Sequence, residues 1–155
     1  MKDKEYILKY KECKYDELSA EDLELVKAAR SMTANSYAPY SHFQVGAAIR
    51  MADGTIATGA NQENAAFPSG TCAERTACYH AAASKPGMAM KKIAVAAFTD
   101  GDFQEQPISP CGACRQALME YEKLHGPIEV ILCGRDSVYL LPSVASLLPF
   151  TFTEF

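Results

Sequence analysis

TCAERTA at residues 71–77 and PCGACRQ at residues 110–116 are the two stretches from which the fold and chemistry of this chain follow. They supply three thiols, Cys72, Cys111 and Cys114, and one carboxylate, Glu74, two residues after the first thiol. Three thiolates can hold Zn²⁺ and leave a fourth tetrahedral position open, while a nearby carboxylate that is not a ligand moves protons. The pattern predicts a hydrolytic zinc site.

Each stretch also predicts a helix that begins at a cysteine. Cys72 and Glu74 would lie about 200° apart inside a regular helix, so Cys72 is expected at the helix entrance. Pro110 disfavours helix in the residue before it, which places Cys111 at the start of the next helix. Two positive helix ends then face one ion and favour thiolates. Arg75 is expected to donate to these sulfurs and offset their charge, and the alternative is an exposed helix charge with an ordinary salt bridge.

The rest of the chain shows alternating helix and strand patterns. Helices are expected over residues 20–34, 73–84 and 112–124, and strands over 45–51, 55–61, 93–98, 128–133 and 138–141. The Asp53-Gly54 pair predicts a hairpin between the first two strands. The connection over residues 134–137 is too short for a crossover, so the last two strands are expected to be antiparallel.

These elements predict one α/β domain over residues 1–155, with a mixed five-stranded sheet between two helical layers. Residues 1–17 are expected to form either a short edge strand around residues 6–10 or a mobile arm. The pattern alone does not decide between the two.

The charge and the apolar content of the chain limit the classes of function that it can have. The net charge is −4 and Lys and Arg are scattered, whereas nucleic-acid-binding proteins usually carry a basic patch, so a free small molecule is the expected substrate. No stretch approaches the ~20 apolar residues of a membrane helix, and MKDKEYILKY at the start lacks a signal-peptide core. We therefore expect no nucleic-acid or membrane partner and a cytoplasmic location, where the six cysteines stay reduced.

The alternative for the cysteines is a structural zinc site without catalytic activity, in which Cys13, Cys78 or Cys133 supplies a fourth sulfur. The spacing of Cys78 and Cys133 favours buried apolar roles instead. The histidines are isolated from any second ligand, and we expect surface or core positions for His42, His80 and His125.

SYAPYSHFQVGAA at 36–48, NQENAAF at 61–67 and LLPFTF at 147–152, together with the two cysteine stretches, resemble the small three-cysteine cytidine deaminases. The resemblance implies a three-layer cytidine deaminase-like fold and zinc-dependent hydrolysis of cytidine and 2′-deoxycytidine, a reaction of pyrimidine salvage. It also implies a homotetramer with one zinc per chain and active sites shared between subunits. In this superfamily, a direct hairpin between the last two strands marks enzymes that act on free nucleosides.

The resemblance also implies roles for particular residues. Glu74 would move protons between water, the pyrimidine ring and the leaving ammonia. Asn61 and Glu63, expected side by side at a strand end, would hold the 3′-hydroxyl of the sugar. Backbone groups at Ala73 and around Ser109 would contact the base.

Three aromatic residues complete the expected site. Phe43 would pack beside the bound nucleoside. Phe67 stands where the family often has a Tyr contributed by a neighbouring subunit, and Phe152 would close over the pyrimidine ring in an adjacent subunit's site. For Phe43, an ordinary core position is the equal alternative.

Three other functions share part of this pattern. A deaminase of another small heterocycle would keep the metal site without needing Asn61 and Glu63. A polynucleotide deaminase would need a basic channel and usually a His as first ligand. A zinc module without catalysis would tolerate loss of Glu74.

Overall fold

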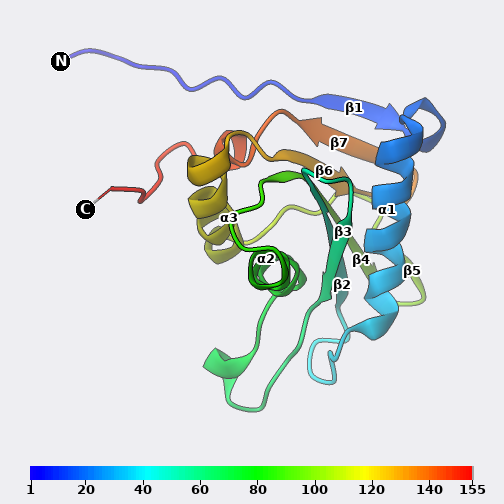
Figure 1. The fold of residues 1–155 in the computed structure, drawn as a ribbon. Coiled ribbons are helices and arrows are strands. Elements are labelled where there is room, and N and C mark those ends of the chain that lie inside the picture. The colour runs from blue at the N-terminus through cyan, green and yellow to red at the C-terminus, as the bar shows by residue number, and fades with distance from the viewer. Residues whose placement is uncertain (155) are drawn as a thin grey trace.

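A mixed β-sheet separates helix α1 from helices α2 and α3 in the computed structural model, which describes residues 1–154 (Figure 1). The helices are α1 (Ala20–Met32), α2 (Ala73–Ser84) and α3 (Gly112–His125). The strands are β1 (Lys11–Lys14), β2 (Gln44–Met51), β3 (Ile56–Ala60), β4 (Met90–Thr99), β5 (Asp102–Phe103), β6 (Glu129–Cys133) and β7 (Ser137–Leu141). Their order is β1-β7-β6-β4-β2-β3, with β5 paired to β4.

The predicted three-layer α/β architecture is confirmed, and helix and strand bounds differ from the expected ones by at most a few residues. The β4–β6 pair is parallel and the other pairs are antiparallel, which makes the sheet mixed. The β2–β3 hairpin turns at Gly54, whose φ is +84°, and β6 and β7 form the expected antiparallel hairpin. Residue 155, part of the predicted domain, lies outside the described residues.

Two short strands, β1 and β5, extend the sheet beyond the five strands expected. The N-terminal strand covers Lys11–Lys14 rather than residues 6–10, because its partner β7 ends at Leu141. The next residue, Pro142, has no N–H with which to continue the ladder. The preceding residues remain extended without strand pairing, and the Tyr6 hydroxyl donates to main-chain carbonyls at residues 145 and 146.

Alternating side chains of β2 build the two cores. Ala47 and Ile49 lie in the cluster that packs against α2 and α3, whereas Ala48 lies in the cluster that packs against α1. This two-residue period explains why both faces of the central strands are apolar: each face is covered by helices.

Strand β3 approaches α2 closely at Gly59. A Cβ atom there would lie 2.3 Å from the main-chain nitrogen of Ala77 and 2.7 Å from the carbonyl oxygen of Ala73. The absence of a side chain lets α2 pack directly on the sheet. The start of α2, with its cysteine, is held in place by this contact.

Among residues 1–154, no helix has both the length and the apolar character required to span a membrane.

Candidate active site

Three sulfur atoms meet where α2 and α3 begin. Cys72 immediately precedes α2 and Cys111 immediately precedes α3, which confirms the expected helix starts, and Cys114 lies in the first turn of α3. The Sγ atom of Cys111 is 3.9 Å from that of Cys72 and 3.5 Å from that of Cys114. All three sulfurs lie within 4.8 Å of one another.

The sulfur separations fit a tetrahedral zinc ion. With Zn–S bonds of about 2.3 Å, two sulfurs of a regular tetrahedron lie about 3.8 Å apart. Within the part of the chain that the structure describes, the group contains no His, Asp, Glu or fourth Cys. The protein thus offers three of the four corners that zinc prefers, the arrangement typical of catalytic sites.

The local electrostatics favour thiolate at the start of α2. The pKa of Cys72 lies well below the ordinary thiol range because Cys114 donates a hydrogen bond to its sulfur, and Arg75 adds to this effect against the opposing effect of burial. The pKa of Cys114 is correspondingly raised. The Nη2 atom of Arg75 lies 3.9 Å from the Cys72 sulfur.

Glu74 is buried beside the sulfurs, with 5% of its surface exposed. Burial raises its pKa to about 7; its own backbone N–H, a hydrogen bond with Cys114 and the charge of Arg75 oppose this shift, while the charge of Cys72 adds to it. A carboxyl group that titrates near neutrality can both accept and donate a proton under the same conditions. The position and the pKa suit a proton shuttle.

The segment between β3 and α2 is tied to the cysteine cluster. Gln62 and Thr71 exchange both main-chain hydrogen bonds at 2.9 Å, and Thr71 directly precedes Cys72. This bridge places Gln62, the residue between Asn61 and Glu63, beside Thr71, the residue before Cys72.

Asn61 and Glu63 lie just beyond β3, which ends at Ala60, rather than on the strand itself. Asn61 accepts a hydrogen bond from the Val45 N–H at 2.7 Å and donates to the Phe43 carbonyl at 2.9 Å. Glu63 accepts from the main-chain N–H groups of residues 40–41 at 2.9 and 3.3 Å. The two side chains therefore face the start of β2 and the segment before it. A hydrogen bond from the Ser41 side chain is the main cause that lowers the pKa of Glu63.

The three aromatic candidates lie in different environments. Phe43 is half-buried at the start of β2, whereas Phe67, in a 3₁₀ turn before α2, is 91% exposed and Phe152 is 68% exposed. The rings of Phe67 and Phe152 therefore do not belong to the core of this chain. Ala73, the first residue of α2, is fully buried.

The remaining cysteines do not join the sulfur cluster. Cys78 is a buried residue of α2, Cys133 is buried in β6 and Cys13 lies in β1 at the far edge of the sheet. Burial raises the pKa of Cys78 and of Cys133 to about 12, so both are neutral thiols. His80 lies with its Nδ1 atom 3.2 Å from the main-chain oxygen of Thr58.

Sequence reasoning missed Arg115, which fixes the loop before Cys111. Its Nε atom donates to the Pro110 carbonyl at 2.8 Å and its Nη2 atom to the Ser109 hydroxyl at 2.9 Å. The Nη1 atom donates to the Leu147 carbonyl at 2.7 Å. Its place directly after the last cysteine of PCGACRQ was the available signal.

Comparison with a family model matches residues 19–125 to the cytidine and deoxycytidylate deaminase zinc-binding region. Among curated proteins, the cytidine deaminase of Sporosarcina psychrophila is 40% identical over 130 residues, covering 84% of this chain and 90% of that protein. The cytidine deaminase of Halalkalibacterium halodurans is 39% identical over 138 residues, covering 83% and 92%.

Solved structures give the same picture. The crystal structure of cytidine deaminase from Burkholderia pseudomallei has a TM-score of 0.68 and 42% identity, covering 83% of this chain and 97% of that one. The cytidine deaminase of Mycobacterium tuberculosis has a TM-score of 0.69 and 28% identity, covering 88% and 100%.

Proposed function

The chain belongs to the cytidine and deoxycytidylate deaminase family, and on that premise we propose that it hydrolyses cytidine and 2′-deoxycytidine to uridine and 2′-deoxyuridine with release of ammonia. The observation that most supports this proposal is the group of three sulfurs with the buried carboxylate of Glu74 beside them. A closed structural site would fill the fourth corner with another ligand and would have no use for Glu74. We assign this reaction to pyrimidine salvage as part of the proposal.

The three cysteines would hold one zinc ion per chain. When bound there, zinc would act as a Lewis acid that makes the attacking water more acidic. The positive ends of α2 and α3 and the guanidinium of Arg75 offset the negative charge of the sulfurs. Without such an offset, an anionic ligand set would oppose the ionisation of water.

Glu74 carries the proton transfers in this proposal. The ionised carboxylate takes a proton from the attacking water as its oxygen bonds to ring carbon 4, and passes that proton to ring nitrogen 3. It takes the second proton from the new hydroxyl and gives it to the departing amino group, whose bond to carbon 4 breaks as ammonia leaves. The ring keeps the oxygen as the carbonyl of uridine.

Recognition of the sugar is assigned to Asn61 and Glu63, which supply a donor and an acceptor for the 3′-hydroxyl. In the structure, both side chains form hydrogen bonds with the main chain of residues 40–45. The same two residues therefore also order this segment beside the proposed site. Phe43 is proposed to flank the base, and the main chain at Ala73 to contact it. The direct β6–β7 hairpin supports a free nucleoside rather than a polynucleotide.

A homotetramer with shared sites is part of the proposal. The exposure of Phe67 and Phe152 supports it, since large aromatic rings outside the core are suited to burial against another subunit. A cytoplasmic location is proposed because the zinc-binding thiols must remain reduced.

Purified protein tests the proposal directly. Metal analysis should find about one zinc per chain, and product analysis should find uridine and ammonia from cytidine. Cytosine, adenosine and a cytosine-containing single-stranded oligonucleotide should be poor substrates. Zinc without turnover of cytidine would reject the proposed reaction, and preferred turnover of one of the other three would replace the substrate class.

A further inference from the structure

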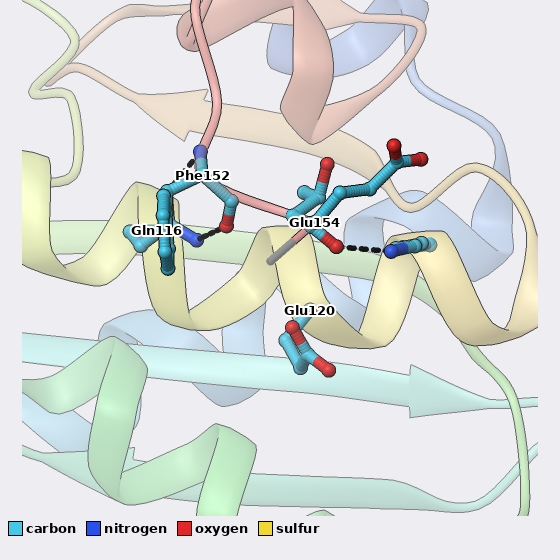
Figure 2. A pocket seen from close by; sticks show the side chains of 6 residues that line it. Gln116, Glu120, Phe152 and Glu154 are labelled. Atoms are coloured by element: carbon cyan, nitrogen blue, oxygen red, sulfur yellow. Dashed lines mark hydrogen bonds between the residues drawn. The ribbon is translucent and has the colours of Figure 1, made fainter.

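The C-terminal segment is bound to α3 through its main chain (Figure 2). The side-chain amide of Gln116 donates from Nε2 to the Phe152 carbonyl at 2.6 Å, and its Oε1 atom accepts from the Phe152 N–H at 3.2 Å. One side chain thus satisfies both main-chain polar groups of one residue. This is the pairing that a neighbouring strand would provide.

The contact lies in a groove of about 610 Å³ between α3 and the segment, lined by Gln116, Glu120, Lys123, Phe152, Thr153 and Glu154. Gln116, Glu120 and Lys123 share one face of α3, since they are spaced four and three residues apart. The ammonium group of Lys123 donates to the Thr153 carbonyl. Glu120 stands between these two in the sequence, and its carboxylate makes no hydrogen bond to the described residues.

Phe152 is 68% exposed, so burial of its ring contributes little to binding of the C-terminal segment on α3. The hydrogen bonds to Gln116 instead fix the backbone from which the ring projects. A backbone held at both its N–H and its carbonyl keeps the direction of the Cα–Cβ bond defined. The direction in which the ring projects from the segment is then set by these main-chain hydrogen bonds.

The same turn of α3 also belongs to the cysteine site. Cys114 is two residues before Gln116, and Arg115 between them joins the loop before Cys111 to the Leu147 carbonyl. The sulfur cluster and the Phe152 main chain are therefore both attached to the same part of α3.

We propose that Gln116 is a positioning residue that holds Phe152 ready for the nucleoside site of a second copy of this chain. The inference rests on the proposed deaminase function and deepens it, because it assigns the hydrogen-bonding amide that presents the shared aromatic. Gln116 acts through Phe152 and does not touch the substrate. It therefore governs substrate affinity rather than the chemical step.

The test uses the full-length zinc protein with Gln116→Met, which keeps the length of the side chain and removes both hydrogen bonds. KM for cytidine should rise about 3–20-fold while kcat stays within about twofold, as expected for lost binding without lost chemistry. Zinc content should not change. The matched control is Glu120→Met on the same helix face, which removes no hydrogen bond and should leave KM for cytidine unchanged.

A double-mutant cycle separates positioning from general damage. If Gln116 acts through Phe152, the variant carrying both Gln116→Met and Phe152→Ala should have the KM of Phe152→Ala alone. Independent, multiplying effects would overturn the proposal. So would a normal KM in Gln116→Met when Phe152→Ala raises KM.

Hydrogen exchange over residues 148–154 provides a readout that does not depend on activity. Gln116→Met should speed exchange there, and unchanged exchange would overturn the proposal even if KM rises. Failure of wild-type protein to deaminate cytidine would instead reject the proposed function. In mixed oligomers, chains with Glu74→Gln and an intact tail should restore a normal KM to Gln116→Met chains, and no restoration would place Phe152 in its own subunit's site.

Discussion

The guanidinium of Arg75, in the first turn of α2, lies 3.9 Å from the sulfur of Cys72, the residue immediately before this helix. Its Nε atom is buried and has no hydrogen-bond partner among the described residues. The pKa of Arg75 is raised chiefly by the contact with Cys72. The sulfurs and the guanidinium therefore stabilise each other's charged forms.

Replacing Arg75 should weaken the metal site. We expect Arg75→Ala to lower zinc affinity or activity about 10–100-fold, the range for residues that orient and tune metal ligands. Arg75→Lys should lie between Ala and wild type, because a lysine keeps the charge without the planar fork. Competition with a chelator measures the zinc affinity. If Arg75→Ala kept the wild-type zinc affinity and activity, the contact between Arg75 and Cys72 would have no role in the metal site.

Glu74→Gln should separate metal binding from catalysis. The amide keeps the shape of the buried side chain but cannot take up a proton, so turnover should fall by roughly 10²–10⁴. Zinc content should remain at the wild-type level, because Glu74 is outside the group of three sulfurs. Turnover of cytidine and metal analysis on the same sample check both parts. A near-normal rate would exclude Glu74 as the proton carrier.

Glu63→Ala should discriminate between the nucleoside and the free base. Loss of the acceptor for the 3′-hydroxyl is expected to raise KM for cytidine about tenfold or more. Cytosine lacks the sugar, so any activity on it should change little. Glu63→Gln serves as the matched control, since it keeps an oxygen for the main-chain N–H groups of residues 40–41. Equal losses for both substrates in Glu63→Ala would indicate a disturbed loop rather than a lost sugar contact.

Gly59→Ala should displace α2 from the sheet. The new methyl group would lie 2.3 Å from the Ala77 nitrogen, and overpacking of this kind typically costs 1–3 kcal/mol of stability, about the size we expect here. Denaturant unfolding of the zinc-free protein gives the free energy. As a control, Gly112→Ala places its methyl in open space at the start of α3 and should not destabilise. Equal stability of wild type and Gly59→Ala would contradict the close approach.

The sequence was informative where local chemistry allowed few solutions. The start of α2 at Cys72 followed because two residues spaced as Cys72 and Glu74 cannot both face a metal from inside a helix. The start of α3 followed from Pro110. The end of α2 followed from the Pro86-Gly87 pair.

Contacts between distant residues could not be predicted in the same way. Gln116 and Glu122 have the polar character of a solvent-facing helix position, and only the tertiary structure shows what they bind. Glu122 is buried and accepts hydrogen bonds from the N–H groups of Ile128, Val144 and Ala145. Its position after a run of helix formers gives no sign of these partners. The location of β1 depended likewise on Pro142, far along the chain.

The placement of β1 has a consequence for how copies of the protein can meet. An outermost strand offers unpaired N–H and carbonyl groups to any other extended chain, which is a route to fibrous aggregates. Here that position is taken by Lys11–Lys14, in which Lys11, Glu12 and Lys14 are exposed. Charged lysine side chains on an edge oppose addition of a further strand. At this border the sheet is thus closed to growth, and orderly association is left to other surfaces of the molecule.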